Sequence, residues 1–212
     1  MKKHLIIAVD GGNGAGKTTL LDKLYKHLSY TQSRYIERIS ELNDNELGRD
    51  VKELLTKHNL SNTTEIAMIC ALRNEILNTR VRQIRADNDK TGTIMLYDRY
   101  SSSTYAFQVH PHDRYASAPL FNSMCSAELG YIQPDIEIIL NIDVELSKTR
   151  IQGRGKELDW KEGKDTDYLK KAHGGFNSLA DSHIIDVTAD KTPDDIFNEA
   201  RIIIDKEIQW LG

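Results

Sequence analysis

The sequence predicts an α/β fold in which a parallel five-stranded sheet carries helices on both faces. Two observations predict this three-layer arrangement. Short apolar runs alternate with amphipathic helical patterns from end to end of the 212-residue chain, and such alternation is typical of parallel sheets. The first apolar run leads through a glycine-rich turn directly into a helical pattern, which places a helix N-terminus at the end of a buried strand.

The strands are predicted from short apolar or β-branched runs bounded by polar or turn-forming residues. They are residues 5–9, 34–39, 93–97, 136–142 and 183–187. The sequence shows no internal repeat, low-complexity tract or Pro/Gly/Ser-rich linker. We therefore expect residues 1–212 to form a single domain.

Helices are expected between these strands, where apolar residues recur at helical spacing. One helix places four apolar side chains on a single face: Leu47, Val51, Leu54 and Leu55. A long helix from about 63 to 86 is marked by Ile66, Ile69, Cys70, Arg73, Ile76, Leu77 and Ile84. Pro193 begins the last helix, which turns inward Ile196, Ala200, Ile203 and Ile204.

Composition and charge argue against several classes of protein. The formal net charge is −4, so the chain has no basic footprint for nucleic acid or an anionic membrane surface. No apolar stretch is long enough to span a membrane or to form the core of a signal peptide. Cys70 and Cys125 lack metal-ligand spacing and indicate buried thiols in a reducing compartment. We expect a soluble, cytoplasmic protein that binds neither nucleic acid nor membranes.

The turn after the first predicted strand fits the phosphate-binding pattern G-x-x-x-x-G-K-[ST]. Its glycines let backbone N–H groups converge on an anion, and the following helix N-terminus adds partial positive charge. In this motif the lysine reaches the β- and γ-phosphates and the hydroxyl faces Mg²⁺, which makes Lys17 catalytic and Thr18 a metal ligand. The sequence thus predicts a P-loop NTPase fold with an ATP site formed by Gly11, Gly12, Asn13, Gly14, Ala15, Gly16, Lys17, Thr18 and Thr19.

A second group of polar residues follows the predicted strand 93–97, which ends on Asp98 and Arg99. In open α/β sheets, ligands bind beyond the carboxyl ends of the strands. We therefore expect Asp98 near the Mg²⁺ and Arg99 near a phosphate. A structural salt bridge between the two side chains is the alternative.

Residues 150–167 interrupt the alternation of strands and helices with glycines and mixed charges. This composition predicts a mobile flap, with a plain surface loop as the alternative. Arg150 and Arg154 flank glycines in this segment. Their place near a nucleotide site favours a lid that closes over it.

Two segments carry a family resemblance. Residues 98–108, D-R-Y-S-S-S-T-Y-A-F-Q, closely resemble the D-R-Y-x-x-S-S-x-A-Y-Q signature of thymidylate kinases. Residues 133–142, Q-P-D-I-E-I-I-L-N-I, are similar to the P-D-L-x-I-x-L-D-V strand of that family. The resemblance covers nearly the whole chain. It implies Mg²⁺-dependent phosphorylation of a deoxynucleoside monophosphate by ATP, above all dTMP to dTDP, and a homodimer.

The resemblance also implies roles for single residues. The arginine matching Arg99 holds the acceptor monophosphate, and the aspartate matching Asp98 lies by the metal. The tyrosine matching Tyr100 packs under the deoxyribose and disfavours a 2′-hydroxyl. Arg150 and Arg154 fall in the lid, where bacterial-type members keep catalytic arginines. The residues implied to contact thymine are Arg73, Thr104 and Gln108.

Several positions depart from the family pattern. Asn13 replaces an acidic residue that meets the acceptor's 3′-hydroxyl, and Ile69 replaces a phenylalanine that stacks on thymine. Residues 41–45 replace the E-P-G-G-T turn, His173 stands where arginine is usual, and Trp160 follows Asp159 where the lid commonly has Asp-Arg. Because these changes cluster at acceptor and lid positions, we expect dTMP to be preferred with weaker discrimination, and dUMP or another deoxynucleotide to be partly accepted.

Other function classes remain open from the sequence. A deoxynucleoside kinase needs a general base for the acceptor hydroxyl, and Glu37 and Glu41 follow the second predicted strand, where nucleoside kinases place such a carboxylate. A monophosphate acceptor needs no strong base, because its second pKa is about 6. A non-catalytic nucleotide-binding switch is disfavoured by the lid and by the lack of an N-K-x-D motif.

Overall fold

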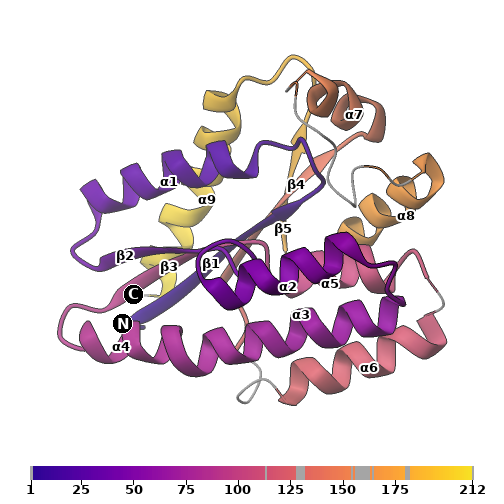
Figure 1. Ribbon diagram of the computed structural model, residues 1–212. Helices are drawn as coiled ribbons and strands as arrows, with labels where there is room; N and C mark the ends of the chain where they lie inside the picture. The colour runs from indigo at the N-terminus through magenta and orange to yellow at the C-terminus, as the bar shows by residue number, and fades with distance from the viewer. Residues whose placement is uncertain are drawn as a thin grey trace.

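A parallel five-stranded sheet forms the middle of the molecule, as the sequence predicts (Figure 1). The computed structural model describes residues 2–112, 114–127, 132–153, 155, 163, 165–179 and 182–211. Its strands are β1 (His4–Gly11), β2 (Tyr35–Ile39), β3 (Thr93–Asp98), β4 (Ile136–Ile142) and β5 (His183–Val187). They lie in the order β2-β3-β1-β4-β5.

The central strand β1 has β3 on one side and β4 on the other. Val9 lies opposite Asp98 of β3, and Gly11 lies opposite Leu140 of β4. The chain connections run to one side of β1 first and to the other side afterwards, so the carboxyl end of β1 is the point at which such sheets form a ligand-binding crevice.

Helices cover both faces of the sheet (Figure 1). The α-helical segments are α1 (Lys17–Thr31), α2 (Glu46–Lys57), α3 (Asn62–Ile76), α4 (Arg82–Asp87), α5 (Ser101–Thr104), α6 (Arg114–Ala127), α7 (Val144–Gln152), α8 (Thr166–Asn177) and α9 (Pro193–Leu211). Two π-helical turns are η1 (Leu77–Val81) and η2 (Tyr105–Val109). The expected long helix is confirmed as α3, η1 and α4 in sequence. No helix in the described part of the chain is long and apolar enough to span a membrane.

The two faces of β1 enter two different hydrophobic clusters. Leu5, Ile7 and Val9 pack with side chains of α1 and α9. Ile6 and Ala8 alternate with them and pack with side chains of α3 and η1. This period of two, with both faces apolar, is what a strand covered by helices on each side requires.

The four apolar side chains expected on one face of α2 differ in how far they are buried. Leu55 is buried and Val51 is half-buried, whereas Leu47 and Leu54 are each 46% exposed. Helix α2 packs against α3, and Val51 lies against the hydrophobic cluster that contains Ile6 and Ala8 of β1.

The cysteines are buried free thiols, as expected. Cys70 of α3 and Cys125 of α6 lie in one cluster with Ile66, Val109 and Phe121. Helix α6 therefore packs against α3.

Two carboxyl groups, one fully buried and one half-buried, lie near the end of β1. Asp10 is fully buried and accepts hydrogen bonds from the Tyr100 backbone N–H at 3.0 Å and from the Ser103 hydroxyl. Glu137 of β4 accepts from the Ser102 hydroxyl at 2.6 Å. Burial raises the pKa of both carboxyls, and the nearby charge of Asp10 raises the pKa of Glu137 further.

Glu137→Gln should therefore stabilise the fold at alkaline pH. A carboxyl with a raised folded pKa contributes stability below its unfolded pKa of about 4.3, and that contribution is lost as the pH rises through the folded pKa. Urea unfolding at about pH 8 should show a gain on the order of 1 kcal/mol for the variant, and the gain should shrink toward about pH 4.5. Glu75→Gln, at an exposed position on α3, is the matched control and should change little. A less stable Glu137 variant at pH 8 would contradict this account.

Candidate active site

The turn between β1 and α1 has the backbone of a phosphate cradle. Gly14 and Gly16 adopt φ angles of +77° and +94°, which disfavour residues with a Cβ. Gly16 is the N-cap of α1, and no described side chain caps this helix end. The N–H groups of the first turn are therefore directed toward an anion.

Lys17 lies folded across this loop. Its Nζ donates to the carbonyl oxygens of Gly11 at 3.1 Å and Gly12 at 2.7 Å, and the residue is 8% exposed. Thr18 and Thr19 are exposed on the first turn of α1. A cation and hydroxyls thus surround the cradle.

Arg99 reaches the same loop from the end of β3. Its backbone has a φ of +70°, rare for a residue with a side chain. The guanidinium donates to the Gly11 carbonyl at 3.1 Å, to the Ser103 hydroxyl at 3.0 Å and to the Asn13 side-chain oxygen. It also lies over the Phe107 ring at 5.5 Å. Backbone strain of this kind is common at functional sites, where surrounding contacts hold the strained residue in place.

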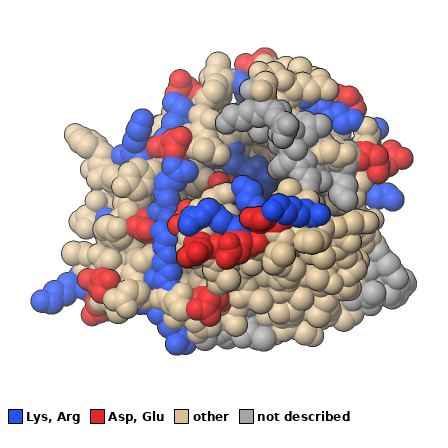
Figure 2. Space-filling model, in the orientation of Figure 1, with Lys and Arg blue, Asp and Glu red and all other residues tan. Residues whose placement is uncertain are grey.

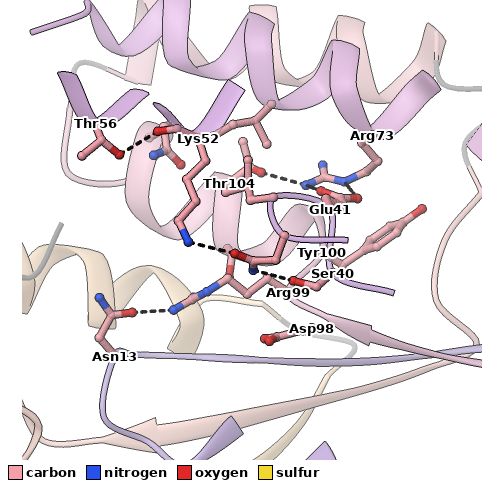
Figure 3. Close-up of a pocket in the computed structure, with 15 residues that line it drawn as sticks. Asn13, Ser40, Glu41, Lys52, Thr56, Arg73, Asp98, Arg99, Tyr100 and Thr104 are labelled. Carbon is pink, nitrogen blue, oxygen red and sulfur yellow. Dashed lines mark hydrogen bonds and ion pairs between the residues drawn. The ribbon is translucent and has the colours of Figure 1, made fainter. Parts of the chain in front are cut away.

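Asp98 does not pair with Arg99 in the described part of the chain, since the Arg99 side chain donates to the phosphate loop and to Ser103 of α5. Asp98 is half-buried at the end of β3, directly beside β1. Its carboxylate lies on the same side of the cavity as Arg99 (Figure 3). The alternative of a structural Asp98–Arg99 salt bridge therefore finds no support.

A cavity of about 310 Å³ opens beside the phosphate loop. Figure 2 shows Lys, Arg, Asp and Glu side chains crowding the rim of a hollow on this face. The seven residues expected to bind the acceptor all line this cavity, together with Asp98. The full lining is Asn13, Ser40, Glu41, Leu42, Asn43, Lys52, Thr56, Ile69, Arg73, Asp98, Arg99, Tyr100, Ser103, Thr104 and Gln108.

Arg73 is held in this cavity by a carboxylate (Figure 3). Its Nε and Nη2 donate to the two carboxylate oxygens of Glu41 at 2.8 and 3.1 Å, and Nη2 also donates to the Thr104 hydroxyl at 3.1 Å. The guanidinium lies over the Tyr100 ring at 5.0 Å. Both charged residues are buried, at 1% and 6% exposure. Burial raises the pKa of Glu41, and the Arg73 charge offsets part of that rise.

Gln108 and Ile69 complete the inner wall of the cavity. Gln108 is fully buried in the π-helical turn η2, and its amide donates to Glu65 at 3.1 Å. Ile69 of α3 is 6% exposed. The wall therefore combines an amide and a guanidinium with apolar surface. At position 69 that surface is aliphatic and offers no aromatic ring.

The structure adds residues that the sequence reasoning missed. Lys52 points from α2 into the cavity, with its Nζ 2.8 Å from the Asn43 side-chain oxygen (Figure 3). Ser40 and Thr56 also line it. The only signal for Lys52 was its charge on an amphipathic helix, and the loop at residues 40–45 matches no motif. The pairing of Glu41 with Arg73 spans 32 positions and leaves no local pattern.

A second, smaller cavity of about 80 Å³ lies on the other side of the phosphate loop. Its lining is Ala15, Gly16, Thr19, Leu20, Arg150, Lys191, Pro193 and Ile196. Arg150 lies at the end of α7, with Nη2 3.4 Å from the Thr188 carbonyl. Arg154, Trp160 and half of the expected lid at 150–167 lie outside the described residues.

A phosphate loop at the N-terminus of a helix, in the middle of a parallel sheet, defines a nucleotide-binding protein of the P-loop class. The family model described as thymidylate kinase matches residues 9–200. This chain belongs to the thymidylate kinase family, a family of nucleoside monophosphate kinases.

Similar proteins from several organisms match most of the chain. It is 27% identical over 205 residues to the thymidylate kinase of Thermosipho melanesiensis, covering 95% of this chain and 98% of that protein. It is 28% identical over 204 residues to a probable thymidylate kinase of Archaeoglobus fulgidus, covering 95% of each. The crystal structure of thymidylate kinase from Ehrlichia chaffeensis matches with a TM-score of 0.71 at 18% identity, over 95% of this chain and 98% of that one. At that identity the likeness shows the fold alone.

The buried Arg73–Glu41 pair should make Glu41→Gln strongly destabilising. Removing one partner leaves a buried charge uncompensated, which costs about 3–5 kcal/mol. Adding Arg73→Met to Glu41→Gln should recover much of this loss, because the unpaired charge is then gone. Urea unfolding measures both variants. Glu53→Gln, in the exposed Lys57 pair, is the control and should change little; equal losses for the single and double variants would argue against the pair.

Proposed function

We propose that this chain transfers the γ-phosphoryl group of ATP to dTMP, releasing ADP and dTDP. The observation that carries the proposal is the placement of two cavities on either side of one phosphate loop. Asn13 lines the larger cavity, and Ala15 and Gly16 line the smaller. A donor in the smaller cavity and an acceptor in the larger one would meet at the loop, where the γ-phosphorus exchanges its bridging oxygen for an oxygen of the acceptor monophosphate.

Positive charge at this meeting point supports phosphoryl transfer. Lys17 would leave the Gly11 and Gly12 carbonyls for the β- and γ-phosphates of ATP. Arg99 and Lys52, both lining the larger cavity, would hold the acceptor monophosphate. Preorganised positive charge around the transferring phosphoryl group is the main contribution that a protein makes to this reaction.

The carboxylates near the cavity favour a monophosphate acceptor over a nucleoside. Glu41 is paired with Arg73, and Glu37 lies 2.7 Å from the Arg80 guanidinium. A carboxylate held in an ion pair is a poor general base for a sugar hydroxyl. A monophosphate acceptor has an anionic oxygen already and needs no base.

The residues at the loop fit a Mg²⁺ ion that arrives with ATP. Thr18 offers an exposed hydroxyl and Asp98 a half-buried carboxylate, and Mg²⁺ is commonly bound by one or two protein oxygens with phosphate oxygens and water. The described residues hold no cluster of three or more His, Cys, Asp or Glu side chains that could bind a metal alone. When bound, the ion would neutralise charge on the β- and γ-phosphates.

The inner wall of the larger cavity suits a keto pyrimidine. Arg73 offers donors toward a base carbonyl, Gln108 offers an amide, and Tyr100 closes the floor beneath the sugar. Ile69 supplies apolar contact without ring stacking. We therefore propose dTMP as the preferred acceptor, with dUMP or another deoxynucleoside monophosphate partly accepted.

The proposal extends to the whole chain. Residues 1–212 would act as one domain, with the segment 150–167 closing as a lid that brings Arg150 and Arg154 to the donor phosphates. Family members are commonly homodimers, and we propose a cytoplasmic homodimer here.

A panel of monophosphates tests the function. ADP release from ATP and Mg²⁺ should be fastest with dTMP, slower with dUMP and absent with thymidine. Lys17→Ala should lower kcat about 10²–10³-fold while the fold is retained, which separates the P-loop reaction from a contaminant. If a purine monophosphate is turned over well and dTMP is not, the base assignment is overturned. Turnover of thymidine alone would indicate a nucleoside kinase.

Arg99→Lys should raise the KM for the acceptor at least tenfold while leaving the KM for ATP nearly unchanged. A planar guanidinium can bind two phosphate oxygens at once, whereas an ammonium is a point charge. Steady-state kinetics with each substrate varied in turn measures both constants. Arg82→Lys, at an exposed position on α4, is the matched control. Equal weakening of both substrates would place Arg99 on the donor phosphates instead.

A further inference from the structure

His173 lies against the phosphate loop, and the transfer described above does not use it. It belongs to α8 and is 8% exposed. Its Nδ1 lies 2.9 Å from the carbonyl oxygen of Ile142, at the end of β4. Because a carbonyl only accepts, Nδ1 carries the hydrogen, and in the neutral ring the lone pair lies on Nε2.

The other edge of the ring faces Gly12. A Cβ built on Gly12 would lie 2.6 Å from both Nε2 and Cε1 of His173, so only a glycine leaves room for the ring at this position. Among the described residues, none makes a hydrogen bond to Nε2. The ring is therefore fixed on its Nδ1 side by the protein, while its Nε2 side is directed at the backbone of the phosphate loop.

Charged groups around the ring keep it neutral before a ligand binds. Burial lowers the pKa of His173, and the charges of Lys17 on α1 and Arg99 after β3 lower it further. The Ile142 carbonyl and Asp143, the N-cap of α7, act in the opposite direction and offset only part of this. With an ordinary pKa of about 6.5, the ring is neutral at neutral pH.

We propose that His173 is a phosphate-binding residue of the donor site, which takes up a proton from solvent when a nucleoside triphosphate binds and then donates Nε2–H to a phosphate oxygen. Phosphate groups in the loop would compensate the charges of Lys17 and Arg99, which removes the two nearby charges that oppose protonation. A hydrogen bond from a cationic donor to phosphate is stronger than one from a neutral donor. The proposal rests on the proposed function only in requiring that the loop binds ATP.

Proton uptake on binding gives the direct test. Titration calorimetry with Mg²⁺ and a non-hydrolysable ATP analogue, in buffers of different ionisation enthalpy, counts the protons taken up. At about pH 7.5 the unmodified protein should take up nearly one more proton per bound analogue than His173→Gln. Any change in the protonation of the analogue itself is common to both and cancels in this difference. His58→Gln, at an exposed histidine after α2, should behave as the unmodified protein. No acceptor is present, so failure of dTMP turnover would not affect this result.

The pH dependence of analogue binding gives the second test. From about pH 6 to 8.5, affinity for the unmodified protein should fall about tenfold more than affinity for His173→Gln. His173→Arg has a permanent charge and should bind tightly across this range without extra proton uptake. If His173→Gln does not fold, His173→Asn replaces it in both tests. Equal proton uptake and equal pH dependence in the unmodified and amide variants would overturn the proposal and leave His173 as a packing residue.

Discussion

The contacts of Arg99 connect the two halves of the site. Its backbone N–H donates to the Val9 carbonyl at 3.1 Å, and its side chain donates to Gly11 and Asn13 on the phosphate loop. The same side chain lines the larger cavity, the proposed acceptor site. A left-handed backbone at this residue turns the guanidinium back over the end of β1, and the strain is offset by these hydrogen bonds and by contact with Phe107. In the proposed reaction, the distance between the donor and acceptor phosphates would therefore depend on β1 and β3, which are adjacent strands.

Negative charge behind the site complements this cation. Asp10 lies one residue before the phosphate loop. Burial raises its pKa, and the charges of Arg99 and Lys17 offset part of that rise. Its hydrogen bonds with Tyr100 and Ser103 hold the turn that carries Arg99. In the larger cavity, Glu41 holds the Arg73 guanidinium directly. Both cations are thus held in place before any substrate binds, so the proposed reaction would need little reorganisation at this site.

The middle of the sheet could be predicted from sequence because β1 and β3 are buried on both faces and appear as apolar runs. The phosphate loop could be predicted because its conformation depends on local glycines and one lysine. The Arg73–Glu41 pair could not, since it joins residues distant in the chain and Glu41 belongs to a loop without a motif. The exposure of Leu47 and Leu54 on α2 could not be predicted, because helical periodicity shows which residues share a face but not whether another element covers it. Lys52 was missed for the same reason: its direction depends on where α2 packs.

His173 and Gly12 show how one local change can alter the chemistry of an otherwise generic loop. The pattern G-x-x-x-x-G-K-[ST] leaves the residue after its first glycine unspecified, yet here glycine is required at position 12 because the imidazole ring occupies the place of its Cβ. An arginine at position 173 would bring a permanent charge close to Lys17 and Arg99 even without nucleotide. A histidine beside these two cations can be neutral in the free protein and cationic only when phosphates are present. The repulsion among like charges in the free site is thereby reduced, and the additional positive charge is present only when the donor is bound.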